Sequence, residues 1–172
     1  MKTLFAFSLL LPLIGGLGTK ATGSNPKPDG PCSSYEYQYN NTMMYPITFY
    51  SVKRDESGAV RIAWLKDHAH EVTVIAGPHD LFERIDGIVQ QYKLHKLKGT
   101  YTPIADVRDG YMWHAYIRFQ KNSISTSGSN AWPKEKLWDG IKAINEYIQS
   151  VIDNAPESDL IETIDYRTYT KY

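Results

Sequence analysis

Residues 101–116, YTPIADVRDGYMWHAY, hold the densest group of side chains that could do chemistry. Asp106, Asp109 and His114 could supply the carboxylate and the imidazole that general acid–base catalysis needs at minimum. Arg108 and Trp113 add a cation and an aromatic ring that could contact a ligand. The alternative is structural: the two aspartates stabilise a turn through the backbone, Arg108 is a surface charge and His114 is an exposed strand residue.

A second candidate is the small polar loop STSGSNAWP at residues 125–133. Hydroxyls and free backbone N–H groups suit an anion or a sugar hydroxyl, so Ser129 and Asn130 are candidate ligand-binding residues. Trp132 could stack on a ligand, or it could cover the end of the core and fix the start of a helix. The loop matches neither a G-x-S-x-G nucleophile elbow nor a phosphate-binding loop with its lysine.

Three histidines, His68, His70 and His79, raise the question of a metal site, because imidazole is a common zinc ligand. No carboxylate or cysteine spacing around them matches a known site. Solvated loop histidines are the simpler interpretation. We therefore expect neither a metal nor another cofactor.

The elements that must position these residues begin with strands. Tyr35, Tyr37 and Tyr39 alternate with polar residues, which predicts a strand with one apolar face, and Gly58 can supply the positive φ of a hairpin turn. The strands expected in this opening meander cover residues 35–39, 47–53, 60–65 and 72–76.

An apolar stripe at helical spacing predicts a helix over residues 81–92. Asp80 and Glu83 resemble a capping box at its start. Gly87 lies inside the helix, where glycine costs about 1 kcal/mol relative to alanine and would mark a close contact with a neighbouring element.

The second half repeats the order of strands followed by a helix. Residues 111–119 alternate as a long strand, with Trp113 and His114 on opposite faces. The other elements expected here are an extended piece over 93–102 before a loop at Pro103, a strand over 123–127 and an amphipathic helix from Pro133 to Asn154.

This order predicts an α+β fold, an antiparallel sheet built from a strand meander with two amphipathic helices on one face. With 172 residues, the chain is long enough for one domain, which we expect over residues 34–154. Residues 155–172 would form either an added edge strand or a loosely held tail.

The N-terminus predicts export. A short basic start, the uncharged stretch at residues 4–14 and the small polar residues that follow are typical of a secretory signal peptide over residues 1–23. Cleavage before Ser24 and cleavage after Gly18 both fit the small-residue rule. Residues 24–33 would be a flexible leader. No other stretch is long and apolar enough to span a membrane, so the mature protein would be secreted or periplasmic.

Charge and cysteine content limit the kinds of partner and the covalent links that we expect. Removal of Lys2 and Lys20 from 19 basic residues, against 19 acidic ones, leaves a formal charge of −2, which disfavours nucleic acid. The single Cys32 forms no internal disulfide. Lipid attachment there is the less favoured alternative, because Asp29, Gly30 and Pro31 do not suit that processing, so an unpaired thiol or an intermolecular bridge is expected.

The strings TMMYPITFYSVKRDESG, YTPIADVRDGYMWHAYIRF and SGSNAWP resemble an uncharacterised exported protein family of gut Bacteroidales. The resemblance covers about residues 35–152. It implies a bacterial envelope setting, and with it an idle glycosylation sequon at Asn40. Since the family carries no established activity, the resemblance assigns no catalytic residue.

We therefore expect an exported, non-enzymatic domain that binds a protein partner or a cell-envelope glycan, in an oligomeric state that the sequence does not indicate. The expected ligand-binding residues lie in two loops, 106–114 and 128–132: Arg108, Asp109, Trp113, His114, Ser129, Asn130 and Trp132. The alternative is a small hydrolase in which Asp106 or Asp109 acts with His114, and Asn130 or loop N–H groups donate to an oxyanion.

Overall fold

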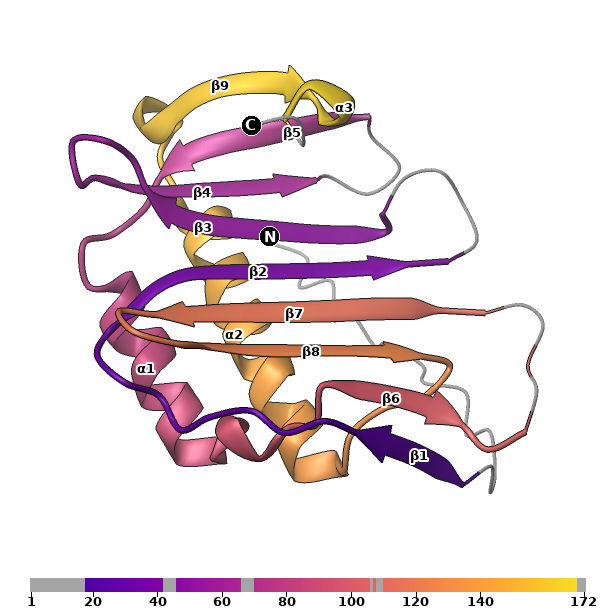
Figure 1. Ribbon diagram of the computed structural model, residues 1–172. Coiled ribbons are helices and arrows are strands. Elements are labelled where there is room, and N and C mark those ends of the chain that lie inside the picture. The colour runs from indigo at the N-terminus through magenta and orange to yellow at the C-terminus, as the bar shows by residue number, and fades with distance from the viewer. Residues whose placement is uncertain (1–17, 42–45, 66–69, 106, 108–109, 170–172) are drawn as a thin grey trace, which may run out of the picture.

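The computed structural model describes residues 18–41, 46–65, 70–105, 107 and 110–169, and these form one α+β unit with nine strands in a single sheet (Figure 1). The strands are β1 (Thr19–Thr22), β2 (Cys32–Asn40), β3 (Thr48–Arg54), β4 (Val60–Leu65), β5 (Glu71–Ala76), β6 (Thr100–Pro103), β7 (Met112–Phe119), β8 (Ser123–Ser129) and β9 (Leu160–Asp165). The helices are α1 (Leu81–Tyr92), α2 (Glu135–Asn154) and α3 (Tyr166–Tyr169), with short 3-10 turns η1 (Leu94–Lys96) and η2 (Glu157–Asp159).

The strand order across the sheet is β1-β6-β8-β7-β2-β3-β4-β5-β9. Neighbouring strands are antiparallel except β6 and β8, which are parallel. The strands from β2 to β5 follow one another in sequence and in space, whereas β7, β8 and β6 extend the sheet on the other side of β2 (Figure 1).

One face of the sheet packs against α1 and α2. The alternation along β2 sends Tyr35 and Tyr37 to this side, where they are almost completely buried. Two tyrosines on this side also form hydrogen bonds to α2. The Tyr35 hydroxyl donates to Asn145 Oδ1 at 2.6 Å, and the Tyr50 hydroxyl donates to Gln149 Oε1 at 2.8 Å. Burial raises the pKa of Tyr35 well above its usual value, so this phenol stays neutral.

The opposite face divides into two parts. Over β3, β4 and β5 it carries a second apolar cluster that includes Phe49, Leu65 and Val72. Tyr166 and Tyr169, in α3, cover this cluster, and both rings meet Phe49 edge to face, at 5.5 and 5.7 Å between centroids. Over β2, β7 and β8 the outward side chains are polar except that of Met112, and this part of the face stays open to solvent.

The chain before β2 is built into the structure. β1 pairs with β6 and lies inside the segment expected to be a signal peptide, and the Ile104 N–H donates to the Gly18 carbonyl at 2.8 Å. Asn25 bridges η1 and β8, since its Nδ2 donates to the Leu97 carbonyl and its Oδ1 accepts from the Ser125 N–H, both at 2.9 Å. The stretch expected to be a flexible leader is thus held by hydrogen bonds.

The C-terminal segment adds β9 to the edge of the sheet beside β5. Of the two outcomes considered for this tail, the structure has the edge strand. Leu160 and Ile161 remain 54% and 44% exposed there.

Three local expectations were wrong. Asp80 makes no side-chain capping bond, and its carboxylate instead lies 3.7 Å from Arg84 Nε. Residues 93–102 form η1 and the start of β6 rather than one extended piece. The close approach expected at Gly87 occurs instead at Gly140, where an added methyl group would collide with Tyr92 and Leu94.

Cys32 begins β2 with its side chain buried. Its N–H donates to Asp86 Oδ2 at 2.9 Å. Burial, and then the charge of Asp86, raise the pKa of the thiol to about 12, so it is protonated at neutral pH. A reactive or modified Cys32 would first have to leave the core.

Two glycine substitutions test this packing in opposite directions. A methyl group at Gly128 would collide with the Ala131 carbonyl and the Trp113 indole, so Gly128→Ala should lower the free energy of unfolding by about 1–3 kcal/mol. Gly87 has no neighbour within 4 Å of an added methyl group, so Gly87→Ala should raise the same quantity by about 0.5–1 kcal/mol. Urea unfolding followed by tryptophan fluorescence measures both, and a stabilising Gly128→Ala would contradict the packing.

Candidate functional site

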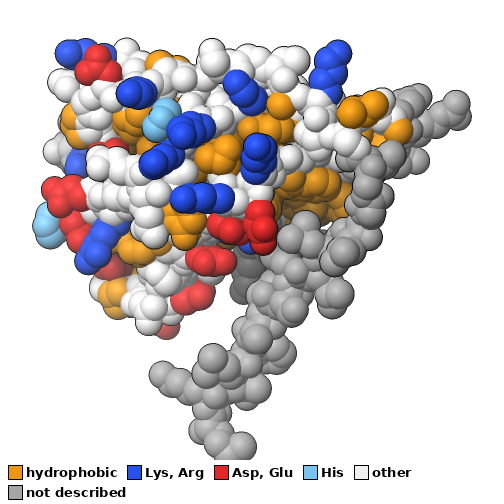
Figure 2. All heavy atoms as spheres, turned by 90° about the horizontal axis from the view of Figure 1, so that it is seen from below, with side chains coloured by type: hydrophobic (Ala, Val, Ile, Leu, Met, Phe, Trp, Pro, Cys, Tyr) orange, Lys and Arg blue, Asp and Glu red, His pale blue; other side chains and the backbone are white. Residues whose placement is uncertain are grey.

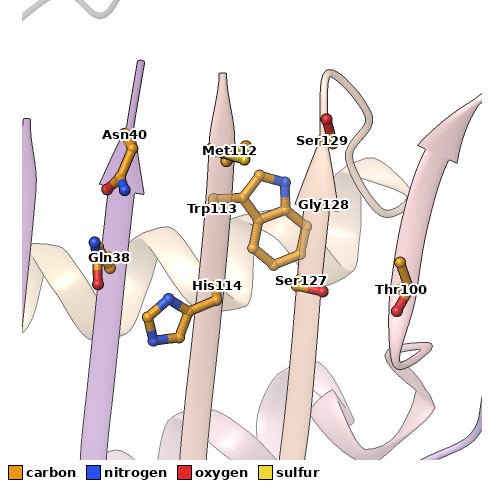
Figure 3. Close-up of a pocket in the computed structure, with 9 residues that line it drawn as sticks. All are labelled: Gln38, Asn40, Thr100, Met112, Trp113, His114, Ser127, Gly128 and Ser129. Carbon is orange, nitrogen blue, oxygen red and sulfur yellow. The ribbon is translucent and has the colours of Figure 1, made fainter. Parts of the chain in front are cut away.

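A pocket of about 330 Å³ lies on the open face of the sheet, across β2, β7, β8 and β6 (Figure 3). The residues that line it are Gln38, Asn40, Thr100, Met112, Trp113, His114, Ser127, Gly128 and Ser129. They come from four strands that are far apart in the sequence, so the pocket exists only once the sheet has formed.

Strand register arranges the outward side chains in two rows. Gln38, His114 and Ser127 are directly opposite one another on β2, β7 and β8, and Thr100 continues this row on β6. Two residues along, Asn40, Met112 and Ser129 form the second row. Directly opposite side chains in a sheet have Cβ atoms about 4.5–5.5 Å apart, so one small ligand can contact several of them.

The chemistry of these rows is polar and uncharged. Two carboxamides, three hydroxyls and one imidazole line the pocket, and its described lining includes no Asp, Glu, Lys or Arg. Met112, 50% exposed, adds an apolar surface beside the polar tips. The Oδ1 atom of Asn40 is buried and has no hydrogen-bond partner among the described residues. A buried acceptor left unpaired costs about 1–3 kcal/mol.

His114 links this pocket to a second hollow on the same face. Its Nε2 lies 3.2 Å from Glu36 Oε1, and both side chains are partly exposed. Glu36 lines the second hollow, of about 580 Å³, whose other lining residues include Tyr116, Arg118 and Lys53. The two hollows therefore adjoin at the Glu36–His114 pair, and we refer to the two together as the groove.

Three of the residues predicted from the sequence line the pocket: Trp113, His114 and Ser129. His114 and Ser129 both line the pocket, on neighbouring strands (Figure 3). Asp106, Arg108 and Asp109 lie outside the described residues. The neighbouring loop residues Ile104, Val107 and Tyr111 are exposed.

Trp113 and Trp132 belong to the core instead. Trp113 is 2% exposed, its indole N–H donates to the Ala131 carbonyl at 2.9 Å, and its ring centroid lies 5.0 Å from that of Trp138. It touches the pocket only as part of its floor. Trp132 is half-buried against the same apolar cluster. Neither ring is placed as an exposed platform for a ligand.

Asn130 closes the end of the β7–β8 pair. It has a left-handed backbone, with φ at 48°, which asparagine tolerates better than most residues. Its N–H donates to the Tyr111 carbonyl, and its Oδ1 accepts from the Tyr111 N–H, both at 2.8 Å. These bonds give Asn130 a structural role in the turn. The sequence analysis had considered Asn130 only as a ligand-binding residue or an oxyanion donor.

The histidine candidates are not brought together. His68 lies outside the described residues, and His70 and His79 flank opposite ends of β5. The His70 carbonyl accepts a hydrogen bond from the Tyr166 N–H at 2.8 Å. Among the residues that the structure describes, no three His, Cys, Asp or Glu side chains are grouped as metal ligands would be.

Several lining residues, Gln38, Asn40, Thr100, Met112 and Ser127, were missed by the sequence reasoning. The signal was present in the strand alternation: when the tyrosines of β2 face the core, Gln38 and Asn40 must face outward. What the alternation could not show was which outward residues on different strands lie side by side.

Comparison with protein-family models, curated proteins and solved structures finds no match. In the described part of the chain, no helix has the length and apolar character that crossing a bilayer requires. The function must therefore be argued from the pocket itself.

Asn130 provides a test of structural against chemical roles. Asn130→Ala should lower the free energy of unfolding by about 1–3 kcal/mol, through the left-handed backbone and the lost bond to Tyr111. Asn130→Gly keeps the backbone freedom and should lose less. Thermal and urea unfolding of both variants give the comparison, and an alanine variant as stable as the wild type would remove the structural role.

Proposed function

We propose that this protein is an exported, non-enzymatic domain that binds a glycan of the bacterial cell envelope in the pocket between β2, β6, β7 and β8. The observation that carries the proposal is the double row Gln38–His114–Ser127 and Asn40–Met112–Ser129, in which every side chain except the apolar Met112 is polar and none is a carboxylate, lysine or arginine. Sugars present hydroxyls that both donate and accept, together with apolar C–H faces. Carboxamides, hydroxyls and a thioether side chain complement both features.

A glycan fits better than a protein partner. A stable protein interface buries about 800 Å² on each side and centres on apolar and aromatic anchors. On the open face, the outward residues of β8 are all serines, which offer hydroxyls and no apolar anchor. Those of β7 are Met112, His114, Tyr116 and Arg118. The continuation of the pocket into the second hollow favours an extended oligosaccharide over a single sugar.

A hydrolase is the second candidate, and the Glu36–His114 contact of 3.2 Å is the observation that favours it. A carboxylate beside an imidazole can hold and move a proton. In this version Glu36 takes the role that the sequence had offered to Asp106 or Asp109. The binding proposal is preferred because Asn130, the candidate oxyanion donor, does not line the pocket that His114 lines.

Export rests on the apolar stretch of residues 4–14, which lies outside the described residues, and the envelope setting rests on the family resemblance. The structure bears on processing. Cleavage after Gly18 keeps β1, whose four residues pair with β6, whereas cleavage before Ser24 removes the whole strand. We propose that the mature chain starts at Thr19, and that buried Cys32 carries no lipid.

Binding can be tested with the neutral oligosaccharide chitotetraose and with an array of bacterial envelope glycans. Gln38→Ala combined with Ser127→Ala removes two hydrogen-bonding side chains of one row and should weaken binding about ten-fold, at about 0.5–1.5 kcal/mol for each bond. Calorimetric titration of the best array ligand measures the change.

Ser125→Ala is the matched control, because Ser125 lies on the same face of β8 two residues away but does not line the pocket. It should bind like the wild type. Equal affinity of the double variant and the control would exclude this pocket. Release of reducing sugar by the wild type, lost in His114→Ala, would favour the hydrolase.

The start of the mature chain is measured by N-terminal sequencing and intact mass of protein recovered after export. We expect Thr19. Gly18→Leu should block processing, because the enzyme that removes signal peptides needs a small residue before the cut, while Ala21→Leu should leave it unchanged. A chain that starts at Ser24 would contradict the role given to β1.

A further inference from the structure

The edge of the sheet formed by β1 carries a concentration of positive charge outside the groove. Two segments, residues 18–28 and residues 87–105, contain five lysines and no acidic residue. They lie side by side, because β1 pairs with β6 and Asn25 bonds to Leu97. We define the basic edge as Lys20, Lys27, Lys93, Lys96 and Lys98.

Figure 2 looks onto this side of the molecule and shows a band of lysine and arginine side chains with a histidine among them. Partial burial, and then the charges of the nearby Lys27, Lys96 and Lys93, lower the pKa of the His95 imidazole. In the part of the chain that the structure describes, none of the five lysines forms an ion pair with a carboxylate. Their charges therefore add rather than cancel.

The backbone beneath the lysines is held in place. Leu94 and Leu97 are completely buried and anchor η1, so the lysines between and beside them point to solvent. Lys93 has a left-handed backbone, with φ at 58°, where α1 ends. The cations are thus presented by a fixed turn and not by a loose tail.

The shape and the neighbours of this edge indicate the kind of partner. Neither of the two hollows described is lined by any of the five lysines, so the edge offers a surface and not a pocket for a small anion. Ile104, 73% exposed, follows β6 on the same edge and packs over Gly18 beside Lys20. Lysines next to an exposed apolar side chain suit a bilayer, whose anionic headgroups meet the cations and whose acyl boundary accepts the apolar group.

We propose that the basic edge docks the protein on an anionic phospholipid membrane. The interaction is peripheral and electrostatic, with Ile104 as a shallow apolar contact. It goes beyond the glycan proposal and uses none of the residues that line the pocket.

The test is co-sedimentation of the exported, processed protein with vesicles of equal parts phosphatidylglycerol and phosphatidylcholine. The wild type should bind these vesicles, should not bind pure phosphatidylcholine vesicles, and should be released as NaCl is raised. Lys93→Gln, Lys96→Gln and Lys98→Gln combined should lower the partition coefficient roughly 100-fold, at about five-fold for each lysine. These side chains are exposed, so circular dichroism should show an unchanged fold.

The matched control removes three cations that lie outside both the basic edge and the two hollows, with Arg84→Gln, Lys121→Gln and Lys142→Gln, and should bind like the wild type. Equal losses in the two triple variants would overturn the assignment to this edge. Binding to soluble dextran sulfate without binding to the anionic vesicles would also overturn it, in favour of a soluble polyanion. Selective loss in the basic-edge variant, together with weaker vesicle binding of Ile104→Ser, is the expected result.

Discussion

The burial of one sheet face against α1 and α2 is the constraint on which the rest of the structure depends. Side chains of a strand alternate between faces, so each apolar residue that the helices cover fixes an outward neighbour. Tyr35, Trp113 and Ile124 face the helices on three adjoining strands. Because these residues face the core, their polar neighbours must face outward and form the open face. The register that buries the core residues also aligns the two rows of side chains in the pocket.

The same constraint explains what could be predicted from the sequence. The strands β2 to β5 and helix α1 were placed to within a few residues, because each carries a full period of apolar residues. η1 and β6 were missed, because three or four residues are too few to show a period. β1 was missed for a different reason: its four exposed residues have no apolar face, and only pairing with β6 makes them a strand.

The candidate site was harder to predict, because it depends on contacts between strands. Trp113 and Trp132 attracted a functional interpretation through residue type alone, yet the core needs large rings and uses both. Gln38 and Ser127 looked ordinary, and they matter only because both are opposite His114. Register is set by the whole sheet, so a local reading of residues 106–114 could find His114 but not its neighbours.

The proposed glycan pocket and the basic edge are related by the order of the strands. The pocket spans the strands from β6 to β2. In the sheet, β6 is next to β1 and β2 is four strands away from β1. At a strand spacing of about 4.8 Å, the pocket lies roughly 5 to 20 Å from that edge.

If the basic edge rests on a bilayer, the strands run along the membrane and the sheet stands upright on it. The groove then opens sideways, and its ligand is held within a short distance of the headgroups. A glycan strand that lies parallel to the membrane can follow such a groove, whereas one that projects outward from the membrane would cross it.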